Sequence, residues 1–155
     1  MTTVPPLLNV LPPEARGRLM ELALETNFPA GARIFEEGAR ADRFWIILNG
    51  TVALDLHVPG RRAAVVDHLG PGDLLGWSWL FPPRSWHLGA AAGSPVRALE
   101  FDAVKVRALC DEDWELGQAL TLRIAEVIAN RLQSARGRLL DLYGPAGGAT
   151  TRLAR

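Results

Sequence analysis

The chain has 155 residues, of which 48% are apolar and 22% charged, a balance that suits one folded domain and argues against disorder. Lys plus Arg and Asp plus Glu number 17 each, so no net positive charge attracts nucleic acid or an anionic membrane. The single cysteine, Cys110, excludes an intramolecular disulfide and a multi-cysteine zinc or iron–sulfur site. Because no signal-peptide pattern or long apolar run is visible, we expect a cytoplasmic protein without a membrane span.

The first predicted element is a short amphipathic helix over residues 14–24, with Pro12 and Pro13 before it and Glu14 in its first turn. After it, recurrent glycines separate short apolar or alternating runs. These runs cover residues 33–35, 44–48, 51–57, 63–69, 88–92 and 96–101. Short strands separated by turns at such close intervals predict an antiparallel sandwich or jelly roll.

Two helices are predicted after the strands. Asp102 can cap a short helix over residues 103–109, and three carboxylates at 111–113 stand where a longer helix starts. The longer helix, from about residue 112 to 142, contains no proline and would extend for about 45 Å. Residues 143–155 are rich in glycine, alanine and threonine and predict a disordered tail. The expected domain therefore covers residues 1–142 and is mainly β with flanking helices.

Two apolar stripes run along the long helix. One stripe contains Leu116, Leu120, Ile124 and Val127. The other alternates steps of four and three residues, the spacing of a coiled-coil seam, through Ala125, Ile128, Leu132, Ala135, Leu139 and Leu142. We expect a parallel homodimer built on this seam. The alternative is a single broad apolar face that packs on the strands of its own chain.

Glycines and apolar residues form a longer pattern across the predicted strands. Residues 28–38 read F-x-x-G-x-x-I-x-x-E-G, residues 42–50 read D-x-F-x-I-x-x-x-G, residues 69–76 read LGPGDLLG, and residues 83–85 read PRS. Positive φ angles at tight turns are expected for Gly31, Gly38, Gly50, Gly70 and Gly72. The pattern resembles the cyclic nucleotide-binding domain of catabolite activator and Fnr-type regulators. The resemblance implies an antiparallel jelly-roll-like barrel, a short N-terminal helix and a long C-terminal dimerisation helix.

The resemblance also implies a phosphate cassette, in which an arginine pairs with a cyclic phosphate and a glutamate accepts the ribose 2′-hydroxyl. Gly76 matches the glycine before that glutamate, Arg84 the arginine, and Ser85 the hydroxyl that assists it. Trp77 replaces the glutamate, and Trp86 replaces a small alanine. The expected ligand-binding residues are Gly76, Trp77, Ser78, Arg84, Ser85 and Trp86.

The nature of the ligand stays open at this point. Residues 74–99 contain no Asp or Glu, so an anion would meet no repulsion there, and the guanidinium of Arg84 suits a phosphate. Three outcomes are compatible with the sequence. The site takes a cyclic mononucleotide such as cyclic AMP or cyclic GMP, it takes another anionic or aromatic ligand, or Trp77, Trp79 and Trp86 plug it. Arg84 itself could serve instead in a structural salt bridge.

We therefore expect a non-enzymatic regulatory module that senses a small anionic ligand, a nucleotide, and signals through its dimeric helix to a partner protein. The alternative is a ligand-free scaffold with a tryptophan-plugged pocket. No catalytic motif is present, and the three histidines lack the spacing of metal ligands, so we expect no metal and no cofactor beyond that ligand. Too few residues follow the long helix for a helix-turn-helix, so we expect no direct DNA binding.

Overall fold

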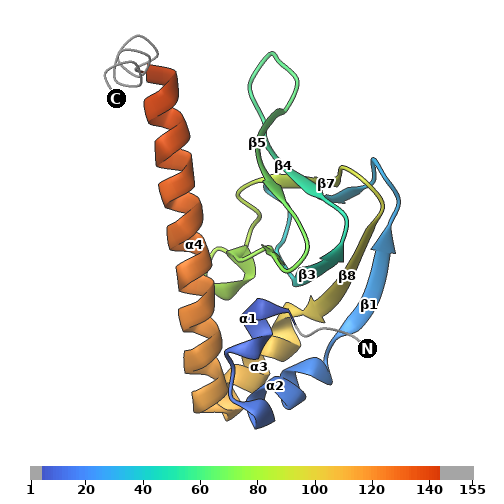
Figure 1. The fold of residues 1–155 in the computed structure, drawn as a ribbon, viewed down its shortest axis with the longest axis vertical. Helices are drawn as coiled ribbons and strands as arrows, with labels where there is room; N and C mark the ends of the chain where they lie inside the picture. Colours follow the sequence, from blue (N-terminus) through green and yellow to red (C-terminus); the bar gives the residue numbers. More distant parts are fainter. Residues whose placement is uncertain (1–4, 144–155) are drawn as a thin grey trace, which may run out of the picture. The chain divides into compact units, whose positions relative to one another are not determined.

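The computed structural model describes residues 5–143, and its strands form two four-stranded antiparallel sheets (Figure 1). The first sheet has the order β1 (Leu24–Phe28), β8 (Val96–Asp102), β3 (Arg43–Asn49) and β6 (Leu74–Leu75). The second sheet has the order β2 (Arg33–Phe35), β7 (Gly89–Ala92), β4 (Val52–Leu56) and β5 (Ala64–Leu69). Among residues 5–143 no ladder of hydrogen bonds closes the two sheets into one barrel. The expected mainly β fold with flanking helices is confirmed.

Aspartate side chains cap the N-termini of two of the helices. The helices are α1 (Pro6–Asn9), α2 (Pro13–Met20), α3 (Ala103–Glu112), α4 (Trp114–Tyr143) and the 3₁₀ turn η1 (Ser78–Leu80). The Oδ1 of Asp102 accepts a hydrogen bond from the Lys105 backbone N–H at 3.1 Å, which confirms the predicted cap of α3. The Oδ1 of Asp113 caps α4 in the same way, from the Leu116 N–H at 3.1 Å. The first predicted helix was too long, because α2 ends at Met20 and the chain becomes strand β1 at Leu24.

The central strand β3 carries much of the core. Phe44, Trp45, Ile46 and Ile47 are all buried, so side chains on both faces of the strand are covered. Phe44 stacks between Trp79 and Phe101, at ring-centroid distances of 4.4 and 4.8 Å. The indole N–H of Trp45 donates to Glu100 at 2.9 Å, which satisfies its one polar atom inside the core.

The turn between β3 and β4 shows why a glycine is needed there. Gly50 has a φ of +94°, and a Cβ at this position would collide with the carbonyl oxygen of Pro95. Positive φ angles are also present at Gly31, Gly38 and Gly72, as expected. Gly70 is not among the positive-φ glycines, so the expectation for that position was wrong.

The chain divides into two compact units, residues 1–121 and residues 122–155. The first unit contains both sheets, α1 to α3 and the start of α4, where Leu116 and Leu120 are buried. In the second unit, the seam residues Leu132, Leu139 and Leu142 have 59%, 52% and 76% of their surface exposed. The predicted tail lies outside the described residues except for Tyr143, which ends α4. Within residues 5–143, no helix combines the length and apolar character needed to cross a membrane.

Candidate functional site

The segment from Gly76 to Trp86 begins where β6 ends and is fixed by its own turn of 3₁₀ helix. Gly76 is buried with a φ of +98°, and its carbonyl accepts a hydrogen bond from the Trp79 indole N–H at 3.1 Å. The Trp79 carbonyl in turn accepts from the Nη1 of Arg107 on α3 at 2.8 Å. Because Trp79 is fully buried, these bonds hold η1 against the body of the first unit.

Trp86 fills the space beside Gly76. Its side chain is buried and stacks on Phe35, with ring centroids 3.9 Å apart and planes 14° from parallel. A Cβ placed on Gly76 would lie 2.7 Å from two carbon atoms of the Trp86 ring. No room is therefore left at this point for a sugar or a base while Trp86 keeps this position.

His87 engages two of the predicted ligand-binding residues. The Trp77 ring stacks on the His87 ring at a centroid distance of 5.0 Å. The buried hydroxyl of Ser78 lies 2.9 Å from the Nδ1 of His87. Trp77 and Ser78 thus have partners within the protein, and the position of the family's glutamate carries an aromatic stack.

Arg84 differs from its neighbours because one nitrogen of its guanidinium group is buried without a hydrogen-bond partner in the described part of the chain. Its φ is +56°, and its Nε is buried and has no hydrogen-bond partner among the residues that the structure describes. Its main chain is well held, since the Ala41 N–H donates to the Arg84 carbonyl at 2.8 Å. Ser85 pairs with Arg40 in an isolated β-bridge. A buried guanidinium N–H without an acceptor is energetically costly, so the Nε of Arg84 is an unsatisfied donor within this segment.

Two further arginines that the sequence analysis missed lie near Arg84. The pKa of Arg107 is below its ordinary value, first because the guanidinium is partly buried, then because Arg84 and Arg40 repel its charge. Asp102 and Asp111 act in the opposite direction and more weakly. Nothing in the sequence marks Arg40 or Arg107, because β-bridge pairing and α3 docking bring these distant positions together.

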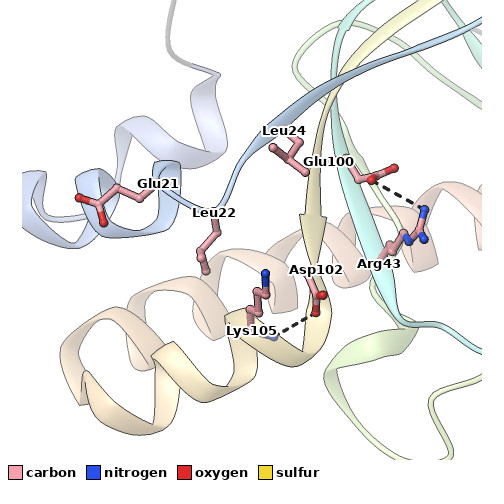
Figure 2. A pocket seen from close by; sticks show the side chains of 7 residues that line it. All are labelled: Glu21, Leu22, Leu24, Arg43, Glu100, Asp102 and Lys105. Carbon is pink, nitrogen blue, oxygen red and sulfur yellow. Dashed lines mark hydrogen bonds and ion pairs between the residues drawn. The ribbon is translucent and has the colours of Figure 1, made fainter.

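Two pockets lie elsewhere in the first unit. One, of about 320 Å³, contains carboxylates from Glu21, Glu100 and Asp102 and cations from Arg43 and Lys105 (Figure 2). Arg43 pairs with Glu100 at 3.7 Å, so part of this charge is already neutralised. The other pocket, of about 480 Å³, lies beside Phe28 and Val96. Neither pocket includes a predicted ligand-binding residue, and the described residues contain no cluster able to hold a metal ion.

Comparison with known proteins adds three findings. A sequence model of the family described as the cyclic nucleotide-binding domain matches residues 25–113, more than half of the chain. A CRP-like cAMP-activated global transcriptional regulator from Mycobacterium tuberculosis is 29% identical over 130 residues. That match covers 84% of this chain and 56% of the regulator, so the chain spans about half the length of this relative.

Solved structures agree with the observed fold. A putative cyclic nucleotide-binding protein from Geobacter metallireducens superposes with a TM-score of 0.74 at 28% identity, covering 82% of this chain and 92% of that one. The catabolite activator protein of Thermus thermophilus superposes with a TM-score of 0.72 over 90% of this chain and 63% of its own. At 24% identity the second likeness bears on the fold alone.

Proposed function

Because this chain belongs to the cyclic nucleotide-binding domain family, we propose that it is a non-enzymatic, ligand-sensing regulatory module of the cytoplasm. In this proposal the segment from Gly76 to Trp86 binds a small anionic ligand, a nucleotide. The ligand-binding residues are Gly76, Trp77, Ser78, Arg84, Ser85 and Trp86. The module acts through a homodimer on a partner protein and does not bind DNA itself.

The buried, unpartnered Nε of Arg84 is the observation that carries the proposal. Residues 74–99 contain no carboxylate that could neutralise this guanidinium from within the segment. An anion would supply the missing acceptor, and charge-assisted hydrogen bonds to guanidinium are among the stronger ones in proteins. The curated relative named above is described as cAMP-activated, which favours a nucleotide among small anions.

A route for the signal follows from the contacts around this segment. Arg107 on α3 donates to the carbonyl of Trp79 in η1, and a single residue separates the end of α3 from the start of α4. A ligand that binds Arg84 would change the electrostatic repulsion on Arg107 and so shift how η1 and α3 dock. Helix α4 would carry this change to its dimer partner and to the downstream protein.

A ligand-free scaffold is the second candidate function. It is favoured by Trp86, which is buried beside Gly76 and stacked on Phe35, as expected for a plugged pocket. In such a module the family fold would serve only to present surfaces for assembly. Arg84 would then contribute to packing and solubility and would have no ligand.

Isothermal titration calorimetry with cyclic AMP and cyclic GMP separates the two candidates. We expect weak binding by the wild type and a loss of about tenfold or more in Arg84→Ala, which removes the charge-assisted bond. Arg97→Ala is the matched control, because Arg97 belongs to the same acid-free stretch but pairs with Glu25 at 3.3 Å. If a wider panel of nucleotides also gives no heat while the fold stays intact, the scaffold function replaces the sensor.

A further inference from the structure

A pocket of about 320 Å³ lies at one end of the first sheet, where α2 ends, β1 and β3 begin, and β8 passes into α3 (Figure 2). The register of the strands brings its side chains together, since Leu24 pairs with Glu100 and Arg43 pairs with Asp102. Residues that pair directly across antiparallel strands share a face of the sheet. Ligand pockets in proteins hold roughly 300–1,000 Å³, so this one has the size for a small molecule.

Arg43 and Glu100 form the first pair of opposite charges in this pocket. The Nη1 of Arg43 and the Oε2 of Glu100 are 3.7 Å apart, which is longer than a hydrogen bond. The other carboxylate oxygen of Glu100 accepts the indole N–H of Trp45 at 2.9 Å. The Oε2 of Glu100 and the guanidinium of Arg43 therefore both keep capacity for hydrogen bonds with a ligand.

Asp102 and Lys105 supply the second pair of opposite charges, and they are linked through the backbone of Lys105. The Asp102 Oδ1 accepts a hydrogen bond from the Lys105 backbone N–H at 3.1 Å. Across residues 5–143, no salt bridge joins the Lys105 ammonium or the Asp102 carboxylate to an opposite charge. Figure 2 shows the carboxylate of Glu21, the third acid of the pocket, directed away from the other labelled side chains. Glu21 therefore adds no charge to the interior of the pocket.

The four remaining charged groups balance, with two carboxylates against two cations. A ligand with a single charge would attract the groups of one sign and repel the others, whereas a zwitterion matches both. Charge-assisted hydrogen bonds are also stronger than those between neutral groups. Apolar surface lies beside the charges, because Leu24 is 67% exposed and Leu22 is half-buried. An apolar group on the ligand would remove this surface from water.

We propose that this pocket binds a free α-amino acid with an apolar side chain, such as leucine. The ammonium group of the amino acid contacts Glu100 and Asp102, and its carboxylate contacts Arg43 and Lys105. Its side chain covers Leu24. Because Asp102 caps α3, the bound amino acid meets the start of the helix that leads into α4. The pocket would thus give the module a second small-molecule input, separate from the segment between β6 and β7.

The first test compares leucine with two analogues that each lack one of its charges. Isoamylamine has the ammonium group without the carboxylate, and isocaproate has the carboxylate without the ammonium group. In chemical-shift titrations of the isotope-labelled full chain, leucine should bind about tenfold more tightly than either analogue. An analogue that binds as tightly as leucine would show a site for one charge and would overturn the proposal. The absence of saturable binding by leucine would overturn it as well.

Lys105 makes it possible to locate the bound amino acid. It is the only lysine in the sequence, so reductive methylation with isotope-labelled formaldehyde gives one lysine signal beside that of the N-terminal amine. Dimethylation keeps the positive charge of the ammonium group. The lysine signal should move during the leucine titration and yield the same dissociation constant as the backbone signals. If the backbone signals move and the lysine signal does not, leucine binds elsewhere and the proposed site is wrong.

Variants test the charges of the pocket. Asp102→Asn keeps an oxygen that can cap α3 but loses the negative charge, and Lys105→Met removes the positive charge. Each should weaken leucine binding by about tenfold or more, whereas Lys105→Arg should change it by less than about threefold. Glu112→Gln is the control, because it removes an exposed carboxylate of α3 outside the pocket.

Equal losses in Asp102→Asn and Glu112→Gln, or unchanged binding in Asp102→Asn and Lys105→Met, would contradict the proposal. None of the residues that line the pocket belongs to the segment from Gly76 to Trp86. Calorimetry with cyclic nucleotides and titration with leucine therefore succeed or fail independently of each other.

Discussion

The ring of Trp86 lies directly against Gly76, so that a Cβ on this glycine would come within 2.7 Å of the Cη2 and Cζ3 atoms. Gly76 also has a φ of +98°, a conformation that other residues adopt only at a cost. Glycine is needed here for two reasons. The chain turns sharply after β6, and the Trp86 ring occupies the space that a side chain at position 76 would fill.

Gly76→Ala should therefore destabilise the protein for two reasons. Gly31→Ala is the matched control, since Gly31 has a φ of +85° but open space where a Cβ would lie. We expect Gly76→Ala to cost about 1–3 kcal/mol more than the control, because the ring must move. Urea unfolding of both variants measures the difference. Equal losses would show that the backbone angle alone demands glycine.

Trp77→Glu tests whether Trp86 closes the nucleotide pocket. The substitution restores the acceptor that the family uses for the ribose hydroxyl, yet Trp86 still fills the space beside Gly76. We expect no gain in cyclic AMP affinity from Trp77→Glu alone, and a gain of about tenfold when Trp86→Leu is added. Calorimetry on the single and double variants, with thermal melts to verify folding, is the measurement. A gain in the single variant would mean that the ring moves aside for the ligand.

Much of the fold could be predicted because its determinants are local. The largely apolar run that became β5 and the Asp102 cap of α3 were both placed within one residue of their observed positions. Strand β1, Leu24–Phe28, was missed because its sequence LETNF has only two apolar residues, at its two ends, and its pairing partner, β8, lies far along the chain. Because the apolar residues just before β1 recur at helical spacing, the predicted helix was extended to residue 24.

The candidate site was predictable only in part, because some of its residues come from distant parts of the chain. Arg84 and Trp86 stand out in the sequence because they lie inside a short, acid-free stretch that resembles a known cassette. Arg40 and Arg107 join them through a β-bridge and through a helix that docks on η1. Such proximity depends on the folded backbone, and one sequence does not encode it in any local pattern.

The ion pair between Arg33 and Asp55 passes close to Gly89. Arg33 bonds both oxygens of the buried Asp55 carboxylate, at 2.5 and 3.1 Å, and a Cβ on Gly89 would collide with both side chains. Asp55 and Glu36 raise the pKa of Arg33 above its ordinary value. Arg33→Ala should cost about 1–3 kcal/mol, because it leaves a buried carboxylate unpaired.

Gly89→Ala should disrupt the same pair. Urea unfolding of Arg33→Ala, Gly89→Ala and the double variant then forms a thermodynamic cycle. We expect the double variant to lose clearly less stability than the sum of the single losses, since the pair can be broken only once. Strict additivity would show that Gly89 is needed for a reason other than the ion pair.

The thiol of Cys110 should titrate above an ordinary cysteine. Burial raises its pKa, and the nearby carboxylates of Asp111 and Asp113 raise it further, since both disfavour the thiolate. The rate of labelling by a disulfide reagent, plotted against pH, should have a higher midpoint in the folded protein than in urea. Asp111→Asn should move the midpoint down, whereas Glu14→Gln, on α2, should not. A folded midpoint at or below the midpoint in urea contradicts the expectation.

A substitution in the seam of α4 tests the predicted homodimer. Leu132 and Leu139 are more than half exposed, and they continue the four–three spacing that begins at Ala125. Two such helices in parallel would bury these side chains against each other, as the a and d positions of a coiled coil. Leu132→Glu would place two carboxylates at that interface, where unpaired charge is costly, so the protein should become monomeric.

Leu140→Glu is the control for this experiment. Leu140 is 72% exposed on the same helix, but it lies one residue past the seam position Leu139 and therefore outside the predicted contact. Sedimentation velocity across a range of concentrations should show a dimer for the wild type and for Leu140→Glu, and a monomer for Leu132→Glu. Should Leu140→Glu dissociate the dimer while Leu132→Glu leaves it intact, the two helices meet through a different face, and the seam from Ala125 to Leu142 is misassigned.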